Sequence, residues 1–323
     1  MRRFLQALVL QIGLVALAAW PALAQAWPDR PVKIVVPFPA GGTADAVPRI
    51  VAEWLSRKWG QPVIIDNRTG AAGNIGAEAV YNALPDGYTL LSAPPPPLVI
   101  NHNLYPKLGF DPTKFEPIIV MAHVPNALIV NPNRIKATNV ADLIAWLKEN
   151  PDKALVATQG NGTTSHLTSE LFQLMAKAKM RHVPYRGSAP ALQGLLTEDV
   201  DLMFDNLGVS LGLTTSGQLK LLAVASSSRV PSMPNVPTIA ETLPGFEAVA
   251  WYAIVAPPKT PKAIIDKVNA DVNEALATPE IRAQLKKLSA EAFGGSVEKT
   301  ANYLQAEIDR WDGVIKAAKI ELQ

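Results

Sequence analysis

The chain has 323 residues, of which 48% are hydrophobic, and it contains no cysteine. This length is sufficient for a large packed core and favours two domains over one, while the lack of cysteine excludes disulfides, thiolate chemistry and a lipid anchor. Lys and Arg number 30 against 28 Asp and Glu, a near-balance that argues against nucleic acid or an anionic membrane as a partner.

The N-terminus has the pattern of an export signal. Arg2 and Arg3 precede an apolar stretch, Leu5–Trp20, and small residues suited to cleavage follow it. The apolar stretch is short for a membrane span. We therefore expect residues 1–24 to be a signal peptide, cleaved after residue 24 or 26, and the mature chain to be exported and unanchored. Removal of the two arginines leaves 28 Lys and Arg against 28 Asp and Glu, so the mature chain is formally neutral.

The first folded stretch predicts a strand, a glycine turn and a helix. The β-branched run Val32–Val36 predicts a buried strand, and apolar residues from Val47 to Trp54 predict an amphipathic helix. Gly41 and Gly42 lie between them and allow the backbone to approach a ligand closely. Because a helix N-terminus attracts anions, the stretch predicts an anion site made of main-chain groups. The alternative is a plain turn in which the glycines serve geometry alone.

Strand and helix patterns alternate along the rest of the chain. Strands are predicted at 62–66, 88–92, 118–120, 127–130, 154–158, 180–184, 200–204, 219–225 and 251–256. Helices are predicted to end at 82, 176 and 196, and to span 140–150, 236–243, 261–277, 279–288 and 297–318. The alternation predicts parallel, doubly wound sheets, whose ligands bind beyond the carboxyl ends of the strands. We expect two α/β lobes joined by crossing strands, with a hinged cleft that holds a small anion.

Seven motifs resemble the substrate-binding proteins of tripartite tricarboxylate transporters, the Bug family. The motifs cover the mature chain in order and lie at 27–32, 37–45, 66–76, 86–90, 160–167, 182–191 and 203–206. The resemblance implies a two-lobed Venus-flytrap fold of the periplasmic-binding-protein type II class. Lobe 1 is expected to comprise residues 27–126 and 250–323, and lobe 2 residues 127–249.

The resemblance also implies a function. The protein is expected to be a monomeric periplasmic receptor that delivers a small carboxylate to membrane permease subunits, with no enzymatic activity, cofactor or metal. The implied ligand-binding residues are Phe38, Ala40, Gly41, Gly42, Thr43, Asp45, Asn161, Gly162, Thr163, Ser165 and Asp205. For Asp45 we favour a role as a helix cap over a ligand contact, and Asp205 faces either the cleft or solvent.

One departure from the family pattern concerns specificity. Pro94–Pro97 stands where the family has a Gly-Thr segment that helps to line the pocket. A polyproline segment has no N–H to donate, so it acts as a pocket wall or as a stiff connector. As a wall it predicts a less polar pocket, suited to an aromatic or bulky carboxylate.

Two other functions are weighed against the receptor. An exported hydrolase would use Ser165 or a buried carboxylate. Ser165 and His166 are adjacent on a helix and point in different directions, however, and no G-x-S-x-G motif is present. The four histidines show no spacing typical of a zinc site, and a P-loop lysine is absent. A sensor that contacts a signalling kinase is the other alternative. Arg186 is either a partner for a ligand carboxylate or a solvated side chain.

Overall fold

The structure is a computed structural model that describes residues 27–318. The predicted signal peptide, residues 1–24, lies outside the described residues. Within them, no helix is both long enough and apolar enough to cross a membrane.

The strands and helices alternate as the sequence predicts. The strands are β1 (Val32–Val36), β2 (Val63–Asn67), β3 (Thr89–Ala93), β4 (Glu116–Val130), β5 (Leu155–Thr158), β6 (Arg181–Pro184), β7 (Leu202–Asn206), β8 (Lys220–Val224), β9 (Val249–Ala256) and β10 (Glu291–Ala292). The helices are α2 (Thr43–Trp59), α3 (Asn74–Tyr81), α4 (Val140–Glu149), α5 (Thr164–Ala176), α6 (Ser188–Leu196), α7 (Leu207–Thr215), α8 (Lys262–Ala277), α9 (Pro279–Lys287) and α10 (Val297–Ala318).

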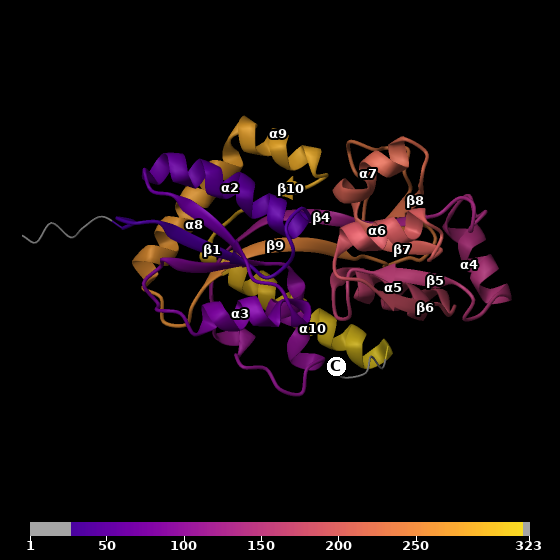
Figure 1. The fold of residues 1–323 in the computed structure, drawn as a ribbon, viewed down its shortest axis with the longest axis horizontal. Helices are drawn as coiled ribbons and strands as arrows, with labels where there is room; N and C mark the ends of the chain where they lie inside the picture. Colours follow the sequence, from indigo (N-terminus) through magenta and orange to yellow (C-terminus); the bar gives the residue numbers. More distant parts are fainter. Residues whose placement is uncertain (1–26, 319–323) are drawn as a thin grey trace, which may run out of the picture.

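Two α/β halves lie along the long axis of the molecule and share two strands (Figure 1). The sheet order is β2-β1-β3-β9-β4-β7-β5-β6, with β8 and β10 paired to β4. The outer strands pair in parallel in each half, whereas β9 pairs antiparallel with both β3 and β4. Residues Glu116–Pro125 of β4 pair with β9, and Asn126–Val130 pair with β7. The long strand β4 therefore belongs to both halves.

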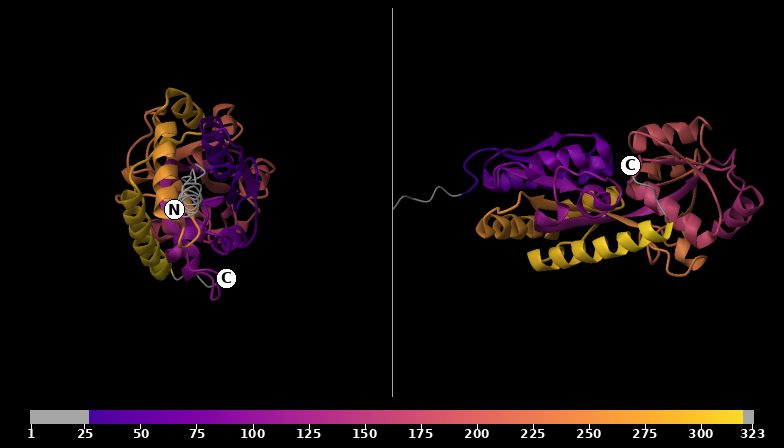
Figure 2. Two further views of the ribbon diagram at one scale, coloured as in Figure 1. Left: turned by 90° about the vertical axis from the view of Figure 1, so that its left-hand side faces the viewer. Right: turned by 90° about the horizontal axis from the view of Figure 1, so that it is seen from below.

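The period of two along each strand divides the core between the two faces of the sheet. In β9, Tyr252 and Ile254 pack toward α2 and α8, whereas Trp251 and Val255 pack with α10 on the opposite face. In the second half, Leu128 of β4 packs with α4 and α5 on one face, and Ile129 packs with α6 on the other. Seen from below, α10 extends along the sheet from the first half toward the second (Figure 2).

Several predicted elements differ in the structure. The strands predicted at 118–120 and 127–130 are one continuous strand, β4, and the helix predicted at 236–243 is only a 3₁₀ turn, Ile239–Glu241. The helix α7 was not predicted, because Gly208, Gly212 and β-branched residues give its sequence a low helix propensity. Packing of Leu207 into the core of the second half stabilises this helix despite that propensity.

Candidate functional site

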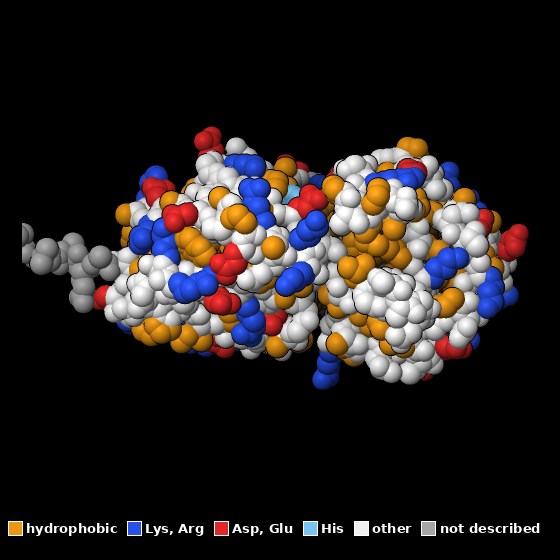
Figure 3. Space-filling model, turned by 90° about the horizontal axis from the view of Figure 1, so that it is seen from above, with side chains coloured by type: hydrophobic (Ala, Val, Ile, Leu, Met, Phe, Trp, Pro, Cys, Tyr) orange, Lys and Arg blue, Asp and Glu red, His pale blue; other side chains and the backbone are white. Residues whose placement is uncertain are grey.

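A cavity of about 90 Å³ lies between the two halves and is partly open to solvent. From the first half it is lined by Phe38–Ala44, Pro94, Pro96 and Tyr252. From the second half it is lined by Gln159, Thr163, Thr164, Arg186–Pro190, Asn206 and Val209. The space-filling view shows a furrow between the halves, with hydrophobic side chains on the flank of the second half (Figure 3). The cavity thus occupies the place where the sequence predicts a cleft.

The glycine turn after β1 forms one wall of the cavity. Gly41 has a φ of 90°, a conformation that favours glycine, and Gly42 is the N-cap of α2. The first N–H groups of a helix have no acceptor within the helix, and here Gly42, Thr43 and Ala44 line the cavity. Main-chain donors are therefore available at this wall, as the sequence predicts.

Asp45 neither caps α2 with its side chain nor lines the cavity, so the preferred expectation of a cap is wrong. Its carboxylate accepts hydrogen bonds from the N–H of Gly41, from Arg49 and from Asn67. Burial alone raises the pKa of Asp45, but these hydrogen bonds outweigh it and hold the pKa below its ordinary value. Asn67 also donates to the carbonyl of Phe38. Asp45 therefore stabilises the glycine turn through these hydrogen bonds and does not itself contact the cavity.

The second half supplies the opposite wall through two loops. Thr163, at the start of α5, accepts a hydrogen bond from the N–H of His166 and donates to the carbonyl of Gly160 at 2.7 Å. Gly187, with a φ of 104°, precedes α6, and Ser188 begins it. Each loop thus ends at a helix N-terminus that faces the cavity.

Besides Asp45 and Asp205, three further residues expected to contact a ligand do not line the cavity. Asn161 is exposed to solvent, and the N–H of Gly162 donates to His166 Nδ1. Ser165 is fully buried, and its hydroxyl donates to the carbonyl of Phe204 at 2.5 Å. This hydrogen bond removes Ser165 as a candidate nucleophile in this structure.

Asp205 faces neither the cavity nor solvent, because it is fully buried beneath the wall. Its Oδ1 accepts hydrogen bonds from Ser188 Oγ at 2.8 Å and from the side chain of Gln159. Both donors line the cavity. Burial raises the pKa of Asp205 to about 6, against the lowering effect of these two hydrogen bonds. Asp205 therefore orients two polar side chains of the cavity and does not itself face a ligand.

The raised pKa of Asp205 predicts a measurable pH dependence of stability. The pKa lies above the value of 3.8 in the unfolded chain, so its contribution to stability is present below pH 4 and is lost as the pH rises through 6. Between pH 5 and pH 7.5 the loss is about 1 kcal/mol. The free energy of unfolding of the native protein relative to that of Asp205→Asn, from urea unfolding at both pH values, should show this loss. The native protein alone also gains stability over this range from His123 and His182, because burial lowers the pKa of each to about 4. An equal pH dependence in both proteins would contradict the assignment to Asp205.

The sequence analysis missed two residues at the floor of the cavity. Tyr252, on the crossing strand β9, donates from its hydroxyl to Asn206 Oδ1 at 3.1 Å, and both residues line the cavity. The sequence feature that could have indicated Tyr252 as a cavity residue is its hydroxyl, which is the single hydroxyl in an otherwise apolar strand. Among the described residues that line the cavity, Arg186 alone carries a formal charge.

Pro94 and Pro96 line the cavity, which agrees with the prediction that the proline segment forms part of the pocket wall. The segment does not remain an extended polyproline helix, however. Pro95 has φ and ψ of −46° and −41°, and Pro96–Ile100 form a buried helical turn. The rings of Pro94 and Pro96 therefore belong to a compact turn, and their missing N–H groups leave this part of the wall apolar.

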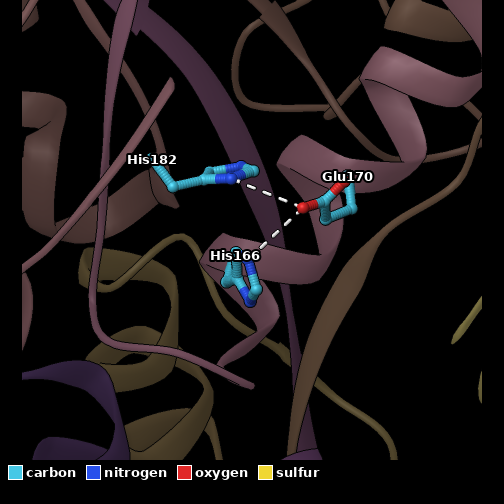
Figure 4. A group of neighbouring side chains, drawn as sticks. All are labelled: His166, Glu170 and His182. Atoms are coloured by element: carbon cyan, nitrogen blue, oxygen red, sulfur yellow. Dashed lines mark ion pairs between the residues drawn. The ribbon is translucent and has the colours of Figure 1, made fainter. Parts of the chain in front are cut away.

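A separate cluster of three titratable residues lies in the second half, outside the cavity. His166 and Glu170, one turn apart on α5, approach His182 of β6 (Figure 4). The spacing of the four histidines in the sequence is not typical of a zinc site. The four-residue interval between His166 and Glu170 is a local signal for the cluster that was not used, and only the tertiary structure brings His182 to them.

Two α/β halves, two shared strands and one cavity between them define a two-lobed periplasmic-binding protein. The chain matches the family described as "Tripartite tricarboxylate transporter family receptor" over residues 47–320. It is 35% identical to Protein BugT of Bordetella pertussis, over 100% of this chain and 99% of BugT. It is 38% identical to the "UPF0065 protein in tcbD-tcbE intergenic region" of Pseudomonas sp., over 90% and 87% of the two chains. The chain therefore belongs to the tripartite tricarboxylate transporter receptor family, of which Bug proteins are members.

Solved structures agree with this assignment. The chain superimposes on "R. palustris Rpa4515 with adipate" with a TM-score of 0.88 and 39% identity, covering 92% of this chain and 100% of the other. It superimposes on the periplasmic binding protein BugD with a TM-score of 0.85 and 35% identity, at the same coverage. For MatC from Rhodopseudomonas palustris with bound malate, the TM-score is 0.83 and the identity 33%, covering 90% and 100%. The predicted family and two-lobed fold are confirmed.

Proposed function

We propose that this protein is a periplasmic receptor that captures a small carboxylate compound in the cavity and delivers it to the membrane permease of a tripartite tricarboxylate transporter. The observation that carries the proposal is the convergence of four helix N-termini on one cavity. The cavity is lined by one residue at the start of each of four helices: Thr43 of α2, Thr164 of α5, Ser188 of α6 and Asn206, which immediately precedes α7.

Each helix N-terminus combines free N–H donors with the positive end of the helix dipole. Four of them around one cavity favour an anion strongly, because the cavity is partly shielded from water. Arg186 adds a positive charge at the same cavity, and the carboxyl of Asp205 lies beneath the wall. We propose that carboxylate oxygens accept hydrogen bonds from the main-chain N–H groups of Gly42, Thr43 and Ser188, because the Gly41 N–H and the Ser188 hydroxyl already donate to Asp45 and Asp205. The structures of relatives with adipate and malate support this class of ligand.

The finer proposal concerns the body of the ligand. Phe38, Pro39, Pro94, Pro96 and Val209 give the cavity an apolar wall. Such a wall gains free energy by covering apolar ligand surface and offers few partners for the hydroxyl and extra carboxylate of citrate. We therefore propose a carboxylate with an apolar body, an aromatic acid above all. Preference for citrate over aromatic and aliphatic acids would contradict this finer proposal and leave the receptor function intact.

Thermal unfolding in the presence of single acids tests both proposals. The panel comprises benzoate, nicotinate, adipate, malate, citrate and glutamate. A ligand that binds only the folded protein, at about a hundred times its Kd, adds roughly 2.7 kcal/mol and raises Tm by several degrees. We expect such a rise with benzoate-type acids and a smaller one with adipate. If no carboxylate raises Tm, the anion cavity has been misassigned.

The remaining parts of the proposal concern the protein in the cell. We propose that residues 1–24 direct export, that the mature protein is a monomer, and that it has no catalytic activity. The burial of Ser165 and its hydrogen bond to Phe204 support a receptor over a hydrolase. We also propose lobe boundaries at 27–126 plus 250–323 and at 127–249, supported by the separate core clusters of the two halves.

A further inference from the structure

The cluster of His166, Glu170 and His182 has the geometry of a metal site. His166 Nε2 lies 3.5 Å and His182 Nδ1 3.4 Å from the same oxygen, Glu170 Oε1. The three atoms all lie within 4.8 Å of one another. Figure 4 shows the two imidazole rings next to each other on the same side of the Glu170 carboxylate, with dashed lines from both rings to the same carboxylate oxygen.

The two distances to Glu170 Oε1 are close to those between the ligands of a tetrahedral zinc ion. With bonds of about 2.0–2.2 Å, the ligand atoms of such an ion are roughly 3.3–3.5 Å apart. Two imidazole nitrogens and one carboxylate oxygen are also a donor set that zinc accepts, with the fourth position left to water. We propose that His166, Glu170 and His182 bind a single zinc-like divalent cation.

The surroundings hold His182 in a suitable orientation. Its Nε2 lies 2.7 Å from Ser169 Oγ. When Nε2–H donates to that hydroxyl, Nδ1 presents its lone pair toward Glu170, which is the arrangement that orients a metal-binding histidine.

His166 must change its tautomer to bind the cation. Its Nδ1 accepts a hydrogen bond from the N–H of Gly162 at 3.1 Å, so Nε2 carries the ring proton in the metal-free protein. Ligation of a neutral imidazole by Nε2 requires the ring proton to move to Nδ1, which can then no longer accept the hydrogen bond from the N–H of Gly162. Metal binding therefore reorganises the loop before α5, which lines the cavity at Thr163.

The cluster is largely buried, but a cation can still reach it from solvent. The exposed fractions of the side chains are 8% for His166, 17% for His182 and 22% for Glu170. Solvent thus reaches the site from the side of Glu170, where a water molecule would complete the coordination. The cation would connect α5 to β6, and the chain continues from β6 into the Arg186–Pro190 loop of the cavity.

Zinc titration of the chelator-treated protein tests the site without any carboxylate ligand present, so its outcome is independent of the proposed function. Calorimetry should show one Zn²⁺ bound per chain. The Kd should rise at least about tenfold in His182→Ala and in Glu170→Gln. His102→Ala is the matched control, because His102 lies in the first half, paired with Asp312 and away from the cluster. It should bind Zn²⁺ like the native protein.

Cobalt gives a second measurement that does not depend on any variant folding well. Co²⁺ bound by two imidazoles, a carboxylate and water should give the intense visible absorption of a tetrahedral complex, and added Zn²⁺ should abolish it. The proposal is overturned if the native protein shows no saturable Zn²⁺ binding, or if Co²⁺ retains the weak spectrum of the hydrated ion. An unchanged Kd in Glu170→Gln, a substitution that preserves shape, would overturn it as well.

Discussion

Alanine at Gly208 is expected to weaken carboxylate binding by about tenfold or more, although Gly208 does not line the cavity. Gly208 lies on α7 in the second half, and an added Cβ would be 2.1 Å from the carbonyl oxygen and 2.4 Å from the carbonyl carbon of Leu288. Leu288 follows α9 in the first half. Since both clashing atoms are backbone, the two halves must move apart to admit the methyl group.

That movement acts on the ligand site through α7. Asn206 and Val209, on either side of Gly208, line the cavity, so a displaced α7 widens it. Overpacking of this kind costs about 1–3 kcal/mol. Because the clash is with backbone, we expect the upper part of this range, about 1.4–3 kcal/mol, which corresponds to roughly a 10- to 150-fold loss of affinity. Calorimetric titration with the acid that gives the largest thermal shift measures the loss. Small-angle scattering of the same samples should show a larger radius of gyration for the ligand-bound variant.

Gly212→Ala is the matched control for this prediction. Gly212 lies on the same helix, and no heavy atom lies within 4 Å of an added Cβ. Alanine there should leave the affinity unchanged and slightly stabilise α7, because alanine is the better helix former. Equal affinities for the two variants would show that contact between Gly208 and Leu288 does not control closure.

Alanine at Gly76 is expected to destabilise the whole protein. Gly76 lies in the first turns of α3, where an added Cβ would be 2.7 Å from the carbonyl oxygen of Arg68 and 2.8 Å from Pro37 Cβ. Pro37 begins the glycine turn that forms one wall of the cavity. Because the clash involves backbone and a rigid ring, we expect a loss of about 2–3 kcal/mol in the free energy of unfolding.

Urea unfolding at neutral pH measures this loss, with Gly313→Ala as the control. Gly313 is an exposed residue of α10, and nothing lies within 4 Å of an added Cβ. Alanine there should raise stability by about 0.5–1 kcal/mol. A Gly76→Ala protein as stable as the native one would mean that α3 can shift away from Pro37 without cost.

The sequence predicted those parts of the site that depend on neighbouring residues. A β-branched run, two glycines and an amphipathic helix placed the Gly41–Thr43 main chain at a strand end, and the structure has β1, the turn and α2 there. The same local logic predicted the wall after β5. These patterns succeed because strand, turn and helix preferences act over a few residues.

The roles of single polar side chains could not be predicted in the same way. Asp45 was expected to cap its helix, but Asn67 and Arg49 hold it behind the turn. Asp205 was expected at the cleft or in solvent, and Ser165 at the ligand, yet neighbouring elements bury both completely. Burial and hydrogen-bond partners depend on which distant segments pack against a residue, and the sequence pattern carries no such information.

By itself, then, the sequence determined the alternation of strands and helices, the glycine turns at the strand ends and the resemblance to a receptor family. The sequence also predicted strands that cross between the lobes, but only the tertiary structure decided that 116–130 is one continuous strand, β4, and that four helix N-termini meet at one cavity. The tertiary structure likewise decided that His182 meets His166 and Glu170. Local preferences specify the elements, whereas the pairing of strands distant in sequence is selected by burial of the whole core.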